Sequence, residues 1–436
     1  MSICLKRTKN YMKTKIMELN KYKLGDIADI INGATPSTSC EDNYDGEIVW
    51  ITPKDLSDQK AKYIEHGSRN ITRKGFNSCS AQMIPAYNIL MSSRAPIGLL
   101  AINKTECCTN QGFKNIVVDR SICDVDFLYY YLKYHIKEVE ALGSGTTFKE
   151  VSKASLQQFE ITIPSLNIQK HIASILADID RKIALNRAIN DNLEAMAKQL
   201  YDYWFVQFDF PNGEGKPYKS SGGKMAWNNR LKSEIPEGWG DAKIKDIANT
   251  YSGGTPTSTN QDYYVGGNIP WINSGELNNP VITDTSNYIT ELGLNNSSAK
   301  LYPQNTILVA LYGATAGKVS LLSFEACSNQ AVCGVMPIDD NMITYIRYYL
   351  ASLYEHFIIL SSGSARDNIS QDTIKNTTLP IPRIEILKKY EDIVKPIVDK
   401  VIANQKEIEN LTKQRDELLP LLMNGQVSVN YHLSDD

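Results

Sequence analysis

The stretch most like a reaction site is YGATAGKV at residues 312–319, which has the look of a phosphate-binding loop. Such a loop cradles phosphates between fixed glycines and then places a lysine and a magnesium-binding hydroxyl. Tyr312 stands where the first glycine is required, and Val319 replaces the hydroxyl. We therefore interpret the segment as a tight turn after a strand. GSGTTF at 143–148 likewise lacks the third glycine of a dinucleotide-binding fingerprint.

Other patterns that would carry catalysis are also missing from the sequence. It contains no H-E-x-x-H, no G-x-S-x-G, no N-P-P-Y type motif of amino-methyltransferases and no convincing paired-carboxylate nuclease motif. The histidines are scattered and the cysteines form no C-x-x-C pair, so neither predicts a metal site. We expect buried, reduced thiols and no catalytic or metal-binding residue in this chain. The cysteines are Cys4, Cys40, Cys79, Cys107, Cys108, Cys123, Cys327 and Cys333.

The distribution of charge says more about possible partners than the net charge, which is only −3. Residues 1–20 hold five Lys/Arg against one acid, whereas residues 241–382 hold seven against twelve acids. Because cations drive non-specific phosphate binding, the second half would bind nucleic acid weakly without a basic partner. No apolar run approaches the ~18 residues of a membrane span, and the basic start lacks the apolar stretch of a signal peptide. We expect a cytoplasmic protein with no membrane contact.

One phrase occurs twice in the chain, as NGATPSTS at 32–39 and as SGGTPTST at 252–259. The likeness extends through both halves, at an offset that drifts only between 218 and 221 residues. Such self-similarity indicates one structural unit used twice in tandem. Each unit begins with short β-rich runs, turns and small helices, which predicts an α/β or α+β globule. Further matches are EIVWIT (47–52) with NIPWIN (268–273), NILMSSRAPIG (88–98) with TILVALYGATAG (306–317), CTNQGF (108–113) with CSNQAV (327–332), and GSGTTFKEVS (143–152) with SSGSARDNIS (361–370).

Each unit ends in a long helix, predicted at about 166–205 and about 384–423. Apolar residues spaced alternately four and three apart predict a coiled-coil seam along each helix. Both seams carry a lysine and then an asparagine at matching places, and polar residues in a seam cost stability but fix register. The predicted seam includes Ile172, Ile175, Ile179, Lys182 and Asn186 in the first helix, and Ile393, Ile397, Lys400, Asn404 and Ile408 in the second.

The helices could each pack on their own globule, or they could pair with each other. A helix of ~40 residues is ~60 Å long, which is longer than a globule of ~150 residues is wide and favours pairing. A chain of globule, helix, globule and helix returns to its start only if the helices run antiparallel, and the linker at 211–229 is long enough for that reversal. The sequence therefore predicts an α/β (α+β) tandem repeat with two globules joined by an antiparallel coiled coil and related by a pseudo-twofold axis. Two similar but divergent globules at a fixed distance suit a long ligand such as duplex DNA.

Taken together, these features resemble the specificity (S) subunits of type I restriction-modification systems. The doubled G-x-T-P-[ST] at 33–37 and 253–257 and the doubled W-I segment carry the resemblance, which covers essentially residues 21–430. None of the motifs would be specific alone, but together they are. The other carriers are LYDYWFVQFDFP (200–211), GKPYKSSGG (215–223), IPEGW (235–239) and LLPLLMNGQV (418–427).

The resemblance implies a non-catalytic subunit with two target-recognition domains, each reading one half of an asymmetric bipartite DNA site. The helical pair would set the spacing and dock two methyltransferase (M) subunits, which would hold S-adenosylmethionine and methylate adenine. Restriction (R) subunits using ATP and Mg would join for cleavage, so no cofactor is expected in this chain. The implied layout is a basic tail (1–20), target-recognition domain 1 (21–164), spacer helix 1 (165–205), a linker (206–240), target-recognition domain 2 (241–382), spacer helix 2 (383–425) and a C-terminal tail (426–436).

Polar side chains in the two globules are the candidates for DNA contacts, because hydroxyls and cations hold the backbone while polar groups read the grooves. The hydroxyls of the doubled motif suit a loop on the DNA backbone, although a structural turn behind a strand is an equally good interpretation. For any single one of the others, a solvated surface role is the favoured interpretation, and contact with DNA is the alternative. Asn110-Gln111 and Asn329-Gln330 recur unchanged, which favours a role in holding the common fold. The candidates are Thr35, Ser37, Thr38, Lys54, Arg94 and Lys114 in the first globule, and Thr255, Thr257, Ser258, Asn273, Glu276, Tyr312 and Lys318 in the second.

Two other functions are compatible with the same sequence. The chain could be a two-headed coiled-coil scaffold that holds partner proteins together without reading DNA, or an enzyme whose site is too dispersed to recognise. Binding that requires a bipartite DNA site would favour recognition, equal binding to all sequences would favour the scaffold, and turnover by the isolated chain would favour the enzyme.

Overall fold

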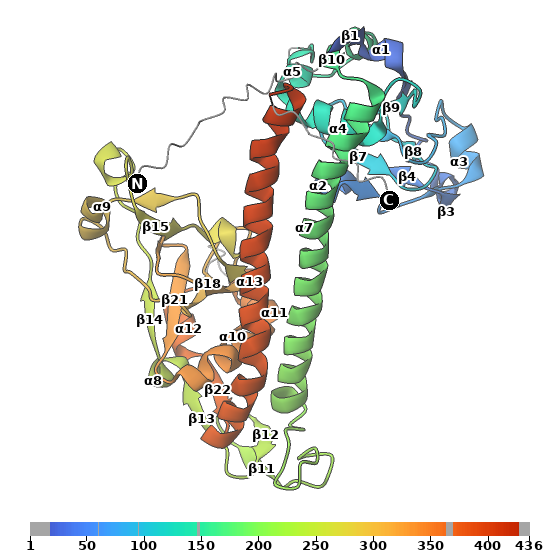
Figure 1. Ribbon diagram of the computed structural model, residues 1–436. Helices are drawn as coiled ribbons and strands as arrows, with labels where there is room; N and C mark the ends of the chain where they lie inside the picture. Colours follow the sequence, from blue (N-terminus) through green and yellow to red (C-terminus); the bar gives the residue numbers. More distant parts are fainter. Residues whose placement is uncertain (1–17, 60, 95, 146–148, 363–368, 427–436) are drawn as a thin grey trace, which may run out of the picture. The chain divides into compact units, whose positions relative to one another are not determined.

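The computed structural model describes residues 18–59, 61–94, 96–145, 149–362 and 369–426 (Figure 1). The chain divides into two compact units, and each combines one globule with parts of both long helices. Unit 1 comprises the chain up to Ala184 and from Asn410 onward, whereas unit 2 runs from Leu185 to Glu409. Most of the basic tail lies outside the described residues. No helix in the described part of the chain is both long and apolar enough to cross a lipid bilayer.

The globule of unit 1, head 1, is built on a five-stranded sheet of order β2-β9-β6-β7-β5. β6 pairs antiparallel with β9 and β7, and all its residues are buried, so it forms the centre of the sheet. β1 pairs with β10 and ties the first strand of the head to the last. The elements are β1 (Asn20–Lys23), α1 (Leu24–Ile27), β2 (Ala28–Asn32), η1 (Glu41–Asn43), β3 (Tyr44–Ile48), β4 (Trp50–Ile51), α2 (Pro53–Asp58), β5 (Tyr63–Ile64), α3 (Arg73–Asn77), β6 (Ile89–Ser92), β7 (Leu100–Asn103), β8 (Cys108–Thr109), β9 (Phe113–Val118), α4 (Val125–Tyr134), α5 (Ile136–Ala141), α6 (Lys153–Gln157) and β10 (Glu160–Ile163).

The globule of unit 2, head 2, repeats this plan with a sheet of order β14-β21-β18-β19-β16. Its central strand β18 is again fully buried, and β13 again pairs with the closing strand β22. Head 2 adds β17 beside β15. The elements are β13 (Gly240–Lys243), α8 (Ile244–Ile247), β14 (Ala248–Ser252), η3 (Gln261–Tyr263), β15 (Ile269–Ile272), η4 (Ser274–Asn278), β16 (Val281–Ile282), β17 (Tyr288–Ile289), α9 (Glu291–Asn295), β18 (Ile307–Ala310), β19 (Val319–Leu322), β20 (Cys327–Ser328), β21 (Val332–Pro337), η5 (Asp340–Met342), α10 (Ile343–Ser352), α11 (Tyr354–Ser362), α12 (Gln371–Asn376) and β22 (Thr378–Ile381).

The tandem repeat predicted from the sequence is therefore confirmed at the level of the fold. In both heads a short strand that carries a tryptophan, β4 or β15, pairs in parallel with the strand before the N-Q pair, β8 or β20. The structure also matches a segment that none of the sequence matches above includes. In α3 and α9 a threonine caps the helix by accepting from a glycine N–H three residues on, Thr72 from Gly75 and Thr290 from Gly293.

The long helices are α7 (Leu166–Tyr201) and α13 (Ile384–Met423), and within each unit they run antiparallel. In unit 1, Arg415 Nη1 lies 2.9 Å from Asp180 Oδ1. In unit 2, Asn186 Nδ2 donates to Glu407 Oε2 at 3.1 Å and Asn404 Nδ2 donates to Asn190 Oδ1 at 2.9 Å, so later residues of α7 pair with earlier residues of α13. Figure 1 shows both helices as long, uninterrupted ribbons. Their pairing, rather than separate packing on the heads, is the arrangement that the sequence favoured.

The predicted seam is correct at some positions and wrong at others. Ile172, Asn186, Asn404 and Ile408 are buried, and Ile175, Ile179 and Ile397 are partly buried. Lys182, Ile393 and Lys400 are exposed. The helices instead bury the neighbouring row, which is Leu176, Ile183, Asn190 and Ala197 in α7, and Val394, Val398 and Val401 in α13.

The cause of this error is that each helix carries two adjacent apolar rows. The spacing of apolar residues predicts a seam but does not say which of two neighbouring rows faces the other helix. Which row is buried depends on contacts with residues far away in the sequence. Val394, Val398 and Val401, for example, belong to the same hydrophobic core as head 2.

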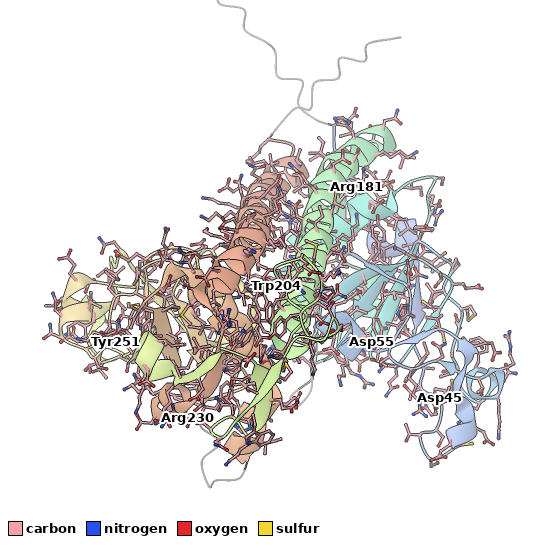
Figure 2. All side chains as sticks on the ribbon, turned by 90° about the horizontal axis from the view of Figure 1, so that it is seen from below. Asp45, Asp55, Arg181, Trp204, Arg230 and Tyr251 are labelled. Carbon is pink, nitrogen blue, oxygen red and sulfur yellow. The ribbon has the colours of Figure 1, made fainter. Side chains whose placement is uncertain are left out.

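The segment after α7 is more ordered than the predicted linker. A π-helical turn, η2 (Asp202–Val206), ends the helix, and the hairpin of β11 (Met225–Asn228) and β12 (Ser233–Pro236) follows. Trp204 packs among buried side chains, with its ring 5.7 Å from that of Tyr390 (Figure 2). In the hairpin turn, Arg230 pairs with Asp241 at 2.9 Å. Trp204 and its aromatic neighbours therefore hold the end of α7 in the hydrophobic core of unit 2.

Candidate nucleic-acid interface

The doubled motif forms a loop that the fold holds tightly from behind. In head 1 the indole Nε1 of Trp50 donates to Ala34 O at 3.1 Å, and the Tyr44 hydroxyl donates to Pro36 O at 2.8 Å. A Cβ on Gly33 would lie 1.8 Å from the carbonyl oxygen of Asn110, so only glycine fits there. The loop is therefore a fixed platform and not a flexible tip.

Head 2 repeats this arrangement atom for atom. Trp271 Nε1 donates to Gly254 O at 3.0 Å, and the Tyr264 hydroxyl donates to Pro256 O at 2.6 Å. A Cβ on Gly253 would lie 2.1 Å from Asn329 O. Because two heads with diverged surroundings keep the same supports, the structural-turn interpretation is correct for the backbone of the motif.

The side chains of the motif point away from these supports. Ser37 and Thr38 are exposed in head 1, as are Thr257 and Ser258 in head 2. The hydroxyls of Thr35 and Thr255, by contrast, donate to the side-chain oxygens of Gln111 and Gln330.

In head 1 the loop borders an open hollow of about 560 Å³. Its lining residues are Gly33, Ala34, Thr35, Pro36, Ser37, Thr38, Cys79, Ser80 and Gln111. The predicted hydroxyls are thus brought together on one surface, where they can donate to an anion.

Of the cations predicted in head 1, only one is fully open to solvent. Lys54 is exposed in the first turn of α2. Arg94 is half-buried, with Nη1 4.0 Å from Glu150 Oε2. Lys114 is buried, and its Nζ lies 3.0 Å from Glu150 Oε1 and 3.4 Å from Ser93 Oγ. We therefore correct the prediction for Lys114, because its charge is already neutralised inside the head and does not reach the surface.

In head 2, Glu276 is also better explained by the fold. Its Oε1 accepts from the backbone N–H of Asn273 at 2.8 Å and from Asn287 Nδ2 at 3.2 Å, which completes a capping box on η4. Thr52 and Asp55 form the same box in head 1. Because the carboxylate of Glu276 is committed to the cap, we correct the prediction that it contacts DNA.

The other predicted residues of head 2 lie near one another but differ in their partners. Asn273 Oδ1 accepts from Asn329 Nδ2 at 3.0 Å, which links η4 to the N-Q pair. Tyr312 is partly buried and hydrogen-bonds Gln330, and burial raises the pKa of its hydroxyl. The Lys318 ammonium donates to Asn278 Oδ1 and is partly buried.

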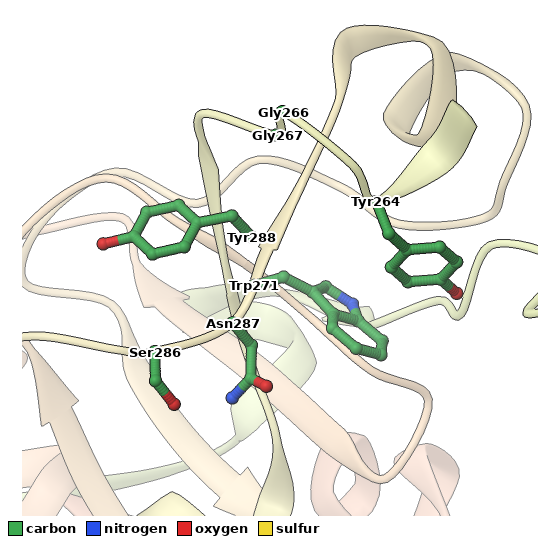
Figure 3. Close-up of a pocket in the computed structure, with 7 residues that line it drawn as sticks. All are labelled: Tyr264, Gly266, Gly267, Trp271, Ser286, Asn287 and Tyr288. Carbon is green, nitrogen blue, oxygen red and sulfur yellow. The ribbon is translucent and has the colours of Figure 1, made fainter. Parts of the chain in front are cut away.

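A second hollow, of about 370 Å³, lies in head 2 beside Trp271, whose indole supports the loop (Figure 3). Figure 3 shows Trp271 and Asn287 side by side, with Tyr264 next to them. In head 1 the residue that matches Asn287 is Arg69, counted back from the capping threonine, and it lies 4.1 Å from the Tyr44 ring centroid. Arg69 also pairs with Asp45 at 3.0 Å. The Arg69 guanidinium of head 1 therefore covers Tyr44, whereas the matching Tyr264 of head 2 borders an open hollow.

No group of His, Cys, Asp or Glu in the described part of the chain could hold a metal ion. Five of the described cysteines are buried, as predicted, whereas Cys40 and Cys79 are partly exposed. Burial raises the pKa of the Cys107, Cys108 and Cys327 thiols to about 12, so they are unreactive near neutral pH.

Comparison with known sequences places this arrangement in a family. The family described as the type I restriction modification DNA specificity domain matches residues 17–195 and again residues 236–413. The specificity subunit of the type I restriction enzyme MjaIX from Methanocaldococcus jannaschii is 33% identical over 415 residues, covering 93% of each chain. The HindI specificity subunit from Haemophilus influenzae is 27% identical over 343 residues, covering 67% of this chain and 74% of its own.

Among solved structures, the fold is similar to that of the S subunit of a type I restriction-modification system from M. genitalium. The two chains share 16% sequence identity, with a TM-score of 0.58, and the match covers 98% of this chain and 99% of the other. At this identity the likeness concerns the fold alone.

Proposed function

The chain belongs to the family of type I restriction enzyme specificity subunits, and we propose that it gives such a complex its DNA sequence specificity by reading an asymmetric, bipartite site. Head 1 reads one half of the site and head 2 reads the other. The chain is a non-catalytic recognition component. Methyltransferase (M) subunits would bind S-adenosylmethionine and methylate adenine, and restriction (R) subunits would use ATP and Mg for cleavage.

One observation carries this proposal, namely that the two heads share one platform but surround it with different side chains. Both loops are held by the same tryptophan and tyrosine hydrogen bonds. At matched positions of the repeat, however, the residues differ. The exposed Lys54 of head 1 corresponds to Gly275 of head 2, and Arg94 corresponds to Tyr312. A shared platform suits the uniform DNA backbone, whereas variable neighbours suit different bases.

The long helices supply a surface for protein partners. Leu185, Ile189 and Met196 of α7 are exposed, and their spacing of four and seven residues places them along one face. A row of exposed apolar side chains at heptad spacing is suited to packing against another helix. We propose that two M subunits dock on the helical pair, which would act as the spacer at residues 165–205 and 383–425.

The target-recognition domains would then occupy residues 21–164 and 241–382. Lys54, Arg94, Thr35, Ser37 and Thr38 are proposed contacts in head 1. In head 2 the proposed contacts are Thr255, Thr257, Ser258, Asn273, Tyr312 and Lys318.

Sequencing of methylated adenines tests the proposal directly. Genomic DNA from cells with and without the gene, in the presence of its M subunit, should differ at one bipartite motif and nowhere else. If the chain is only a scaffold, deleting it should leave the methylated motif unchanged as long as M is present. Turnover by the purified chain alone would instead indicate a hidden enzyme.

Replacing one head provides the matched control. A chimaera in which residues 21–160 come from another specificity subunit should methylate a motif altered in one half only. A change in both halves would show that the heads do not read independently.

A further inference from the structure

The N-Q pair in each head holds a glutamine at the edge of the loop platform. Asn110 N donates to Ile51 O at 3.0 Å, and the Asn110 side-chain oxygen accepts from Gly112 N at 2.8 Å. In head 2, Asn329 N donates to Ile272 O at 3.0 Å, and its side chain accepts from Ala331 N at 3.1 Å. The asparagine therefore shapes the turn in both heads. The glutamine that follows is not needed for these contacts.

Both glutamines are exposed, and both are oriented by the same partner. The Thr35 hydroxyl donates to the Gln111 side-chain oxygen, and the Thr255 hydroxyl donates to that of Gln330. With its oxygen engaged by a hydroxyl of the platform, each amide still has two N–H donors. In head 2 Tyr312 hydrogen-bonds the same amide, so one N–H of Gln330 remains for a ligand. The fold-holding role that the sequence favoured for this repeated pair is supported by the asparagine contacts and by the threonine–glutamine hydrogen bonds, but it does not explain why both glutamines are exposed.

The hollow next to Gln111 is lined by uncharged hydrogen-bond donors of the kind that bind an anion. Its described lining offers the hydroxyls of Thr35, Ser37, Thr38 and Ser80 and the Gln111 amide, and none of these residues is charged. Hydroxyls and amides donate hydrogen bonds to phosphate oxygens, and such contacts fix register on the duplex without carrying sequence information. No carboxylate lines the hollow to repel an anion.

We propose that Gln111 and Gln330 are phosphate-positioning residues, whose amide NH₂ groups each donate to a backbone phosphate of one half-site while the paired threonine holds the amide in place. This inference rests on the proposed function. Two heads that read different bases have only the sugar-phosphate backbone in common, so a threonine–glutamine pair retained in both suits the backbone better than a base. Head 2 adds the Tyr312 hydroxyl beside Gln330, which head 1 replaces with Arg94.

Alanine variants in the full chain, purified together with its M subunit, test the proposal by equilibrium DNA binding. Gln111→Ala and Gln330→Ala should each weaken binding about ten- to a hundredfold, the value of one hydrogen bond to a charged group. The loss should be equal for the cognate site and for sites altered in either half. The slope of log affinity against log salt should stay unchanged, because a neutral donor displaces no counterion.

Lys54→Ala is the matched control, since Lys54 is an exposed cation of the same head. If Lys54 contacts a phosphate, its loss should lower the salt slope by about 1, which shows that the assay resolves a single charge. Relaxed discrimination at one base pair in Gln111→Ala would overturn the proposal in favour of base reading. Affinity equal to that of the wild type would also overturn it.

Gln111→Glu separates a phosphate contact from a structural role. The carboxylate keeps the acceptor for the Thr35 hydroxyl, but it replaces the NH₂ donor with a negative charge. The proposal expects Gln111→Glu to bind DNA more weakly than Gln111→Ala, with an unchanged melting temperature. A purely structural role predicts the opposite order, because Glu preserves the pairing with threonine.

The two failures are distinguishable in this experiment. If the wild-type complex shows no preference for a bipartite site, the proposed function fails. If the wild type is specific but the glutamine variants bind as it does, only the present inference fails.

Discussion

At the residue scale, the ion pair between Arg347 and Glu194 fastens head 2 to α7 within unit 2. Arg347 Nη2 lies 2.9 Å from Glu194 Oε1 and donates to Pro280 O at 3.0 Å, and the arginine is only 3% exposed. Removing one partner of a buried pair leaves the other charge uncompensated. We expect Arg347→Met to lower the free energy of unfolding of unit 2 by about 3–5 kcal/mol, measured by denaturant titration.

The double variant Arg347→Met/Glu194→Leu is the control for this prediction. With both charges removed, most of the lost stability should return, because apolar residues of similar volume can replace a buried pair. A double variant as unstable as Arg347→Met alone would show that the packing of the arginine stem, and not the charge, matters at this position.

The stacking of Arg69 on Tyr44 predicts a difference in solvent access between the two loop tryptophans. Trp50 is buried, whereas Trp271, beside the open hollow of head 2, is partly exposed. Arg69→Asn copies Asn287 of head 2 and should increase quenching of the tryptophan fluorescence by acrylamide. Asn287→Arg should decrease it. Equal quenching in both variants and the wild type would mean that the guanidinium does not shield Trp50.

For single residues, repetition in the sequence was a better guide to exposure than charge was, and the DNA contacts themselves stay a prediction. The loop hydroxyls belong to a motif present twice, and the structure exposes most of them. Lys114 and Glu276 were chosen for their residue type, but their partners Glu150 and Asn273 fix their roles. The contact of Lys114 with Glu150 depends on how the chain folds back on itself, and no local pattern encodes it. The cap formed by Asn273 and Glu276, by contrast, spans three residues and is a local pattern that the sequence already contained. Gln111 could have been found, because it recurs with the paired threonine.

At the scale of elements, two asparagines lock the long helices in unit 2. Asn404 Nδ2 donates to Asn190 Oδ1 at 2.9 Å, and Asn190 Nδ2 donates to Val401 O at 3.3 Å. Asn404→Leu would leave Asn190 buried without its partner and should lower the free energy of unfolding by about 1–3 kcal/mol. Thermal unfolding of the full chain measures this change.

Replacing both asparagines should raise the stability of the chain but allow the two helices to pair in more than one register. Asn190→Leu/Asn404→Leu should melt at a higher temperature than the wild type, because an apolar seam packs without unpaired amides. Cross-linking between cysteines placed in the two helices should then give more than one pairing. A single pairing in the double variant would show that the heads, and not the asparagines, fix the register.

The sequence was enough to predict that both long elements are helices, but not which face of each helix is buried. Period and length were enough to predict both helices, and α7 and α13 occupy the expected regions. The choice between two adjacent apolar rows depends on tertiary packing, so Ile393 was placed inside although it is exposed. The hairpin β11–β12 escaped prediction because its strands are short and directly follow residues 213–224, a stretch rich in Gly, Ser and Lys that typically indicates a loop.

At the scale of the whole molecule, the repeat was the strongest signal in the sequence. A duplicated unit of about 220 residues fixed the number of heads, their common topology and the order of globule and helix. Only the identity of the bases that each head would read is left to side chains that differ between the heads. Specificity and architecture are therefore encoded separately, which allows one to be changed without the other.

A change in the length of both helices tests that separation. Inserting four residues into α7 and four into α13 adds one turn, or ~6 Å, to each helix. This is near two base-pair rises of ~3.4 Å, so the gap between the half-sites should grow by about two base pairs while both half-sites keep their sequence. Methylated-motif sequencing reads the gap and the half-sites in one experiment. An unchanged gap with altered half-sites would mean that the helices do not measure distance along DNA.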